Sequence, residues 1–191
     1  MTTEIICVID RSGSMDKIKD DAIEGFNDFL NEQKKLPFTA YLTLILFDHE
    51  YKLIHNNIPL QNIPSLNHKT YQPRGSTALL DAIGTTINSV GLRLKNTLLE
   101  KRPNKIIVVI LTDGQENTSQ EFNLSKIKEM IQLQTNTYSW KFVFLGANQN
   151  AFTDATNMGI KIAFNYKPNS AGIRGAYSIA SRAVSKHREG N

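Results

Sequence analysis

Two aspartates and two serines are the side chains whose types and spacing could support chemistry in this chain. Asp10 ends an apolar run, and Ser12 and Ser14 follow it at a spacing of two, with Gly13 between them. Alternate residues of such a loop can point the same way, so the loop can present three oxygens to one small cation. Asp113 ends a second apolar run. Oxygen ligands without nitrogen or sulfur suit Mg²⁺, Mn²⁺ or Ca²⁺ and not zinc.

The same serines have a simpler interpretation. Asp, Ser and Gly are typical of any turn that precedes a helix. Ser14 or Asp16 could serve only as the N-cap of that helix. The Asp-x-Ser-x-Ser spacing taken alone is consistent with either interpretation, so the elements that would position these residues have to be considered.

Apolar runs rich in β-branched residues alternate with segments of helical spacing. We expect strands at 4–9, 41–47, 51–55, 105–112, 140–145 and 161–164, and helices at 16–35, 77–99, 123–133, 152–158 and 170–187. This alternation predicts a mostly parallel sheet with helices on both faces. Only three residues separate the second strand from the third, which permits a hairpin and excludes a parallel crossover. The predicted fold class is therefore α/β, a three-layer, doubly wound, Rossmann-like arrangement with one antiparallel edge strand.

This fold class gives the two aspartates a common place. Ligands of an open parallel sheet gather at the carboxyl ends of the strands, where the strand order reverses. If the sheet is doubly wound, the strands that end at Asp10 and Asp113 are neighbours at that point. Both carboxylates would then face one crevice.

Three short motifs carry a resemblance to a known family. The sequence Asp-Arg-Ser-Gly-Ser-Met at 10–15 resembles the first motif of the metal-ion-dependent adhesion site (MIDAS) of the von Willebrand factor A (vWA) family. That family adds a threonine from a second loop and an aspartate from a third, often within Thr-Asp-Gly. Here Gly-Ser-Thr-Ala-Leu at 75–79 and Leu-Thr-Asp-Gly at 111–114 are similar to these loops. The motifs stand in the family's order, and the element order matches over nearly the whole chain.

The resemblance implies a ligand set and a function. Ser12, Ser14 and Thr77 would contact one ion through their hydroxyls, while Asp10 and Asp113 would supply negative charge directly or through water. The expected ion is Mg²⁺, with Mn²⁺ or Ca²⁺ as alternatives. One coordination position stays open in the family, and an incompletely neutralised ion attracts a carboxylate. We therefore expect a metal-dependent interaction module for a protein partner that presents Asp or Glu, and no enzyme.

Two other functions compete with this one. An aspartate that ends the first strand can accept a phosphoryl group, as in a Mg²⁺-dependent hydrolase. Haloacid-dehalogenase-like hydrolases place a second aspartate two residues later, where this chain has Ser12. The third possibility is a scaffold that uses its basic C-terminal segment. Residues 161–191 hold six Lys/Arg and one acid, a net charge of +5, against −1 for the rest. A nucleic-acid contact is one reading, and a favourable helix dipole is the other.

The remaining features indicate a cytoplasmic protein. Cys7 is the one cysteine and cannot form an internal disulfide. No apolar run approaches the roughly 20 residues that span a bilayer, and the N-terminus reads as a strand and not as a signal peptide. We expect residues 1–191 to form a single domain with a final helix at about 170–188 and no membrane partner. Family context fits a bacterial or phage protein.

Several residues near the motifs have two interpretations. Arg11 and Arg74 could steer an acidic partner or be exposed loop arginines. Glu116 could act at the site or belong to a solvated loop, and Asn148 could shape the crevice or cap a helix. None of the four histidines has the spacing of a metal-binding pair, so no transition-metal site is expected.

Overall fold

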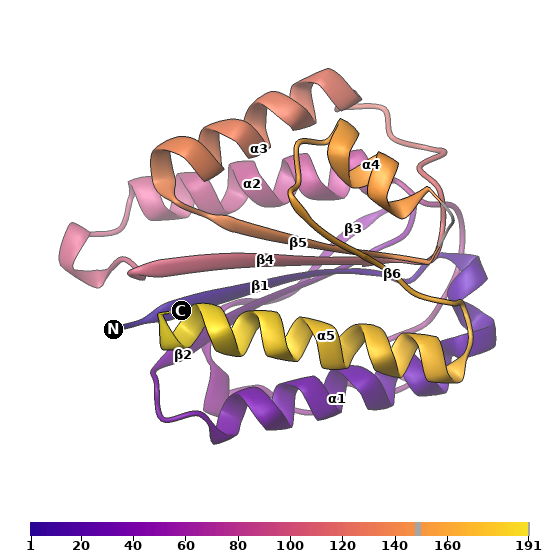
Figure 1. The fold of residues 1–191 in the computed structure, drawn as a ribbon, viewed down its shortest axis with the longest axis horizontal. Helices are drawn as coiled ribbons and strands as arrows, with labels where there is room; N and C mark the ends of the chain where they lie inside the picture. The colour runs from indigo at the N-terminus through magenta and orange to yellow at the C-terminus, as the bar shows by residue number, and fades with distance from the viewer. Residues whose placement is uncertain (148–149, 191) are drawn as a thin grey trace.

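A six-stranded sheet forms the middle layer of the computed structural model, which describes residues 1–147 and 150–190 (Figure 1). The strand order is β3-β2-β1-β4-β5-β6. Only β2 and β3 pair in antiparallel fashion, which confirms the predicted fold class with its antiparallel edge strand. The strands are β1 Thr3–Asp10, β2 Ala40–Phe47, β3 Tyr51–Pro59, β4 Lys105–Thr112, β5 Lys141–Gly146 and β6 Ile162–Asn165.

Helices cover both faces of this sheet. Figure 1 shows α1 and α5 on one face and α2, α3 and α4 on the other. Their bounds are α1 Lys19–Lys35, α2 Leu79–Lys95, α3 Leu124–Tyr138, α4 Ala151–Asn157 and α5 Ser170–Glu189. None of the helices in the described part of the chain is long and apolar enough to cross a bilayer.

The central strands are buried on both faces, which explains their continuous apolar sequences. In β1, Ile5 and Ile9 pack towards α1 and α5, while Ile6 and Val8 pack towards α2 and α3. Cys7 is buried in this strand, and burial raises the pKa of its thiol. Cys7 therefore packs as a small hydrophobic residue of the core.

The strand order reverses between β1 and β4, as the sequence predicted. The chain leaves β1 for β2 on one side and reaches β4 on the other. Ile9 lies beside Leu111 in the parallel register, so the ends of the two strands are adjacent. Asp10 and Asp113 therefore leave the sheet at one edge.

Two helix starts differ from the prediction in ways that affect this edge. A 3₁₀ turn, Gly13–Ile18, precedes α1, and its buried Met15 and Ile18 anchor the loop to the core. Helix α2 begins at Leu79 instead of Thr77, because the backbone of Ala78 is not helical (φ −94°, ψ 64°); the Ala78 N–H donates to the Asp48 carbonyl. Both loops therefore keep their hydroxyl side chains outside regular helix.

Two arginines of the basic C-terminal helix make contacts with other parts of the chain. The Arg174 guanidinium pairs with Asp21 and Glu24 of α1. Arg188 is buried and donates to the Gln33 carbonyl at 2.6 Å and to the Phe38 carbonyl at 2.6 Å. These two arginines hold α5 against α1.

Replacing Arg188 by methionine should lower the free energy of unfolding by about 2 kcal/mol, since the buried carbonyl and side-chain oxygen of Gln33 and the part-buried Phe38 carbonyl each lose a donor. Urea denaturation measures this difference. Arg182→Met on the exposed side of the same helix is the matched control and should stay close to the wild type. Equal stability of the two variants would contradict the anchoring role of Arg188.

Candidate metal centre

Hydroxyl and carboxylate oxygens converge at the carboxyl ends of β1 and β4. The Ser14 hydroxyl donates to Asp113 Oδ1 at 2.6 Å, and Ser12 Oγ lies 3.2 Å from Ser14 Oγ. These three side chains come from two loops that are 99 residues apart in sequence. The structure thus brings together three of the five ligands that the sequence predicted.

Thr77 reaches the same place from the loop before α2. A Cβ atom added to Gly114 would lie 3.0 Å from Thr77 Oγ1 and 3.8 Å from Ser14 Oγ. The absence of a side chain at Gly114 therefore leaves open the space between the threonine and serine hydroxyls. Glycine at this position keeps a cradle that any other residue would narrow.

Asp10 is the fifth of the predicted ligands, and its side chain is buried. Its Oδ1 accepts the Ser12 N–H at 2.6 Å and its Oδ2 accepts the Thr112 hydroxyl at 2.6 Å. The Tyr71 hydroxyl, from the irregular stretch after β3, donates to the Asp10 carbonyl at 2.6 Å. Sequence analysis missed Thr112 and Tyr71 as supports, because neither position carries a pattern that indicates a contact.

Burial governs the charge of this group. It raises the pKa of Asp10 to about 6 and also raises that of Asp113. The hydrogen-bond partners that the structure describes for the Asp10 carboxylate are neutral. A buried carboxylate with neutral partners is stabilised by a bound cation. The donor set contains only oxygens, so the residues fit a hard divalent cation.

Backbone hydrogen bonds join the first and second loops. The Gly13 N–H donates to the Gly75 carbonyl at 3.0 Å, and the Arg74 N–H donates to the Arg11 carbonyl at 2.9 Å. Gly75 has a φ of +64°, and a Cβ there would lie 2.1 Å from His49 Nδ1. The positive φ and the neighbouring His49 imidazole therefore favour glycine at position 75.

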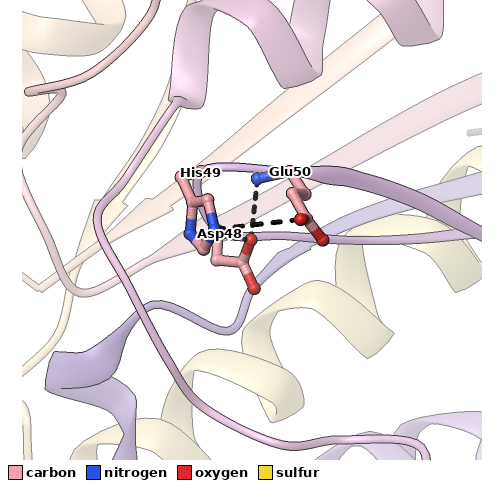
Figure 2. A group of neighbouring side chains, drawn as sticks. All are labelled: Asp48, His49 and Glu50. Carbon is pink, nitrogen blue, oxygen red and sulfur yellow. Dashed lines mark hydrogen bonds and ion pairs between the residues drawn. The ribbon is translucent and has the colours of Figure 1, made fainter.

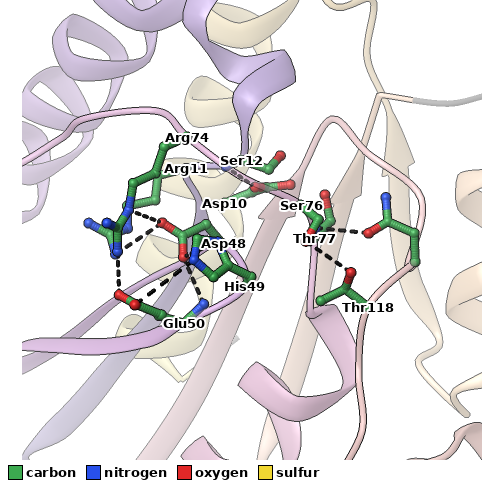
Figure 3. A network of polar contacts seen from close by, with 11 residues as sticks. Asp10, Arg11, Ser12, Asp48, His49, Glu50, Arg74, Ser76, Thr77 and Thr118 are labelled. Carbon is green, nitrogen blue, oxygen red and sulfur yellow. Dashed lines mark hydrogen bonds and ion pairs between the residues drawn. The ribbon is translucent and has the colours of Figure 1, made fainter.

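Asn117 fixes the backbone of Thr77 from the third loop. Its side-chain oxygen accepts the Thr77 N–H at 3.0 Å, and its own N–H donates to the Thr77 carbonyl at 3.1 Å. The Thr118 hydroxyl donates to Ser76 Oγ at 2.9 Å beside it (Figure 3). The second and third loops are therefore held together next to the Thr77 hydroxyl.

Glu116 stabilises the third loop through hydrogen bonds and is not one of the candidate metal ligands. Its two oxygens accept N–H groups of Leu80, Thr118 and Ser119 and the Ser119 hydroxyl, at 2.7–2.9 Å. The carboxylate thus ties the third loop to the start of α2. Asn148 lies outside the described residues.

Arg11 is 4% exposed, so its interpretation as an exposed loop arginine was wrong. Its guanidinium lies 3.1 Å from Asp48 Oδ2, and Arg74 Nε lies 3.0 Å from the same oxygen. Arg74 also pairs with Glu50, and the Asp48 carbonyl accepts the Ala78 N–H at 2.9 Å (Figure 3). The burial of Arg11 removes it from the surface that a partner would meet.

Asp48, His49 and Glu50 are a second group of potential ligands, with ligand atoms within 4.8 Å of one another (Figure 2). However, Asp48 Oδ1 accepts the Glu50 N–H at 2.7 Å, and both Arg11 and Arg74 occupy Oδ2. Two guanidinium groups already provide the positive charge that a metal would bring. The cluster therefore acts as an ion-pair network beside the oxygen site.

Replacing Asp10 by asparagine should raise the free energy of unfolding of metal-free protein at pH 7 by up to about 3 kcal/mol. The raised pKa means that the contribution of Asp10 to stability is complete below its ordinary pKa of 3.8 and is lost as the pH rises through about 6. The asparagine keeps the hydrogen bonds, because Thr112 Oγ1 can accept from the amide while donating to the Gly114 carbonyl 3.1 Å away.

Urea denaturation in EDTA across this pH range checks the prediction, with Asp16→Asn in the exposed part of the same loop as control. The advantage of the Asp10 variant should grow as the pH rises. A variant that is no more stable than wild type at pH 7 would show that the neutral hydrogen bonds already compensate for the buried charge.

Comparison with known proteins gives matches in structure only. No protein-family model and no curated protein matches the sequence. Proximal thread matrix protein 1 from the mussel byssus, solved with a zinc-occupied MIDAS motif, has a TM-score of 0.65 and 14% identity over 95% of this chain and 45% of its own. A von Willebrand factor type A protein from Catenulispora acidiphila has a TM-score of 0.66 and 11% identity over 94% and 42%.

The vWF domain of the type V pili tip protein Mfa5 from Porphyromonas gingivalis has a TM-score of 0.63 and 10% identity over 96% of this chain and 95% of its own. The chain thus spans less than half of the mussel and Catenulispora proteins and nearly all of the Mfa5 domain. At these identities the similarity concerns the fold. The sheet order, the helical layers and these neighbours together show that the chain has the fold of a von Willebrand factor A domain.

Proposed function

We propose that this chain is a divalent-metal-dependent module for protein interaction. The metal site consists of Asp10, Ser12, Ser14, Thr77 and Asp113. One observation carries the proposal. The Ser14 hydroxyl donates to the Asp113 carboxylate, and the Thr77 hydroxyl lies across the space that Gly114 leaves without a side chain. The buried Asp10 carboxylate beside them has neutral hydrogen-bond partners. The zinc-occupied motif in the mussel protein supports a divalent ion at such a site. Mg²⁺ is the proposed ion.

The five side chains divide the work by burial. Asp10, Ser12 and Thr77 are buried and hold the inner side of the site, whereas Ser14 is exposed and Asp113 is partly exposed. The bound ion would supply a positive charge and a coordination position open to an oxygen from outside. An aspartate or glutamate of a partner protein has the charge and the oxygen that this position takes.

The surface beside the site supports a protein partner. A groove of about 390 Å³ adjoins Gly114, and its apolar walls are Leu79, Leu80, Leu124 and Met158. A side chain that neighbours the partner's carboxylate can enter this groove. The proposed interaction involves no chemical reaction of the partner. A cytoplasmic location is consistent with the buried, unpaired Cys7.

Calorimetric titration of Mg²⁺, Mn²⁺ and Ca²⁺ into EDTA-treated protein tests the metal site. The wild type should bind at one site, and Asp10→Ala and Asp113→Ala should lose that binding while remaining folded. Asp16→Ala is the matched control, because Asp16 is an exposed acid two residues from Ser14. Binding that persists in Asp113→Ala, or that disappears in Asp16→Ala, would contradict the proposed ligand set.

A pull-down with immobilised protein tests the interaction itself. Partners should be retained in Mg²⁺, released by EDTA and absent when the bait is the Asp113→Ala variant. Capture that is equal with and without metal would show that the interaction does not pass through the site.

Asn117→Ala should weaken metal binding about tenfold, because the residues that orient metal ligands typically contribute this much to affinity. The expected cause is greater freedom of the Thr77 backbone, since Asn117 holds both its N–H and its carbonyl. Calorimetry measures the change, with Gln120→Ala on the same loop as control. Unchanged affinity in Asn117→Ala would show that the rest of the loop suffices to place Thr77.

A further inference from the structure

The turn between α2 and β4 carries two leucines that contact little of the chain. Leu98 is 61% exposed and Leu99 is 78% exposed, and we call this pair the leucine tip. Figure 1 shows the pink segment around it projecting past the start of β4. Since the metal centre lies where β1 and β4 end, the leucine tip is at the opposite edge of the sheet.

The helices on either side of this turn in sequence also carry exposed apolar side chains. Leu92 of α2 and Leu133 and Tyr138 of α3 are all more than half exposed. Between these helices lies a slot of about 420 Å³, which Trp140 and Leu94 line among other residues. Leu133 and Tyr138 also line this slot, so exposed apolar side chains gather there as they do at interaction sites.

Positive charge surrounds the leucine tip. Lys95, Lys101 and Arg102 flank it in sequence, and we call them the basic collar. Lys95 and Arg102 also line the slot. Glu100 is the one acid between positions 92 and 104, and the segment 130–141 contains none. The surface is therefore apolar at its tip and cationic around it.

Further cations extend this edge towards α5. Lys141 follows Trp140 directly and lines a second groove, of about 570 Å³, together with Arg182 and Lys186. This groove is lined by residues of β4, β5 and β6 and of the second half of α5, and Lys141 is the first residue of β5. Part of the basic excess of the C-terminal segment thus gathers at the same edge as the leucine tip.

In contrast to the sequence-based expectation of no membrane partner, we propose that the leucine tip and the basic collar dock on the surface of an anionic lipid bilayer. Aliphatic side chains on a projecting turn can enter the boundary between headgroups and acyl chains, while surrounding lysines and arginines attract anionic headgroups. The projecting shape of the turn and its positive charge favour a lipid surface over a protein that binds in the apolar slot. Docked in this way, the protein holds its opposite edge, with the metal centre, away from the membrane.

Co-sedimentation with vesicles tests the proposal, using phosphatidylcholine alone or with about 30% phosphatidylserine. The full chain should bind the anionic vesicles several-fold more than the neutral ones, in EDTA as well as in Mg²⁺. Independence from metal separates this result from the fate of the proposed metal site.

Two double variants assign the effect. Leu98→Asp with Leu99→Asp should abolish binding, and Lys95→Glu with Lys101→Glu should reduce it at least several-fold. The matched control is Lys52→Glu with Leu53→Asp, an exposed pair on β3. No binding by the wild type, equal binding to neutral vesicles, or an equal loss in the control would overturn the proposal. Self-association that only the leucine variant removes, without vesicle binding, would assign the tip to a second copy and also overturn it.

Discussion

The carboxylate of Asp10, buried at the end of the central strand, is the constraint on which the site depends. Burial raises its pKa to about 6, and its described hydrogen-bond partners are neutral. The fold therefore holds a charge at a cost that a bound cation would offset. Thr112 donates to this carboxylate and Tyr71 donates to the Asp10 carbonyl, while the neighbouring loops place further oxygens beside it.

The neighbouring strand β2 is followed by a second buried carboxylate at the same edge of the sheet. Asp48 is also fully buried, but Arg11 and Arg74 neutralise it within the chain. That network leaves no charge for a metal to offset, and it fixes the loops on which Ser12 and Thr77 are carried. Two buried aspartates thus divide between them the functions of holding the loops and, in our proposal, holding the ion.

The two ends of the sheet differ in chemistry because parallel strands place their carboxyl ends together and their amino ends together. Loops that follow β1 and β4 bring aspartates and hydroxyls to one edge. Segments that precede β4 and β5 bring Lys95, Lys101 and Lys141 to the other. In our two proposals, each of these edges meets a different partner.

The sequence by itself determined the element order, the antiparallel edge strand and the adjacency of Asp10 and Asp113, because apolar periodicity and short connections leave few possible topologies. Only the tertiary structure decided that Arg11 is buried, that Asn117 holds Thr77 and that Tyr71 supports Asp10. These contacts join loops about 40 to 60 residues apart. The packing of the loops determines these contacts, and neither local propensity nor residue spacing predicts them.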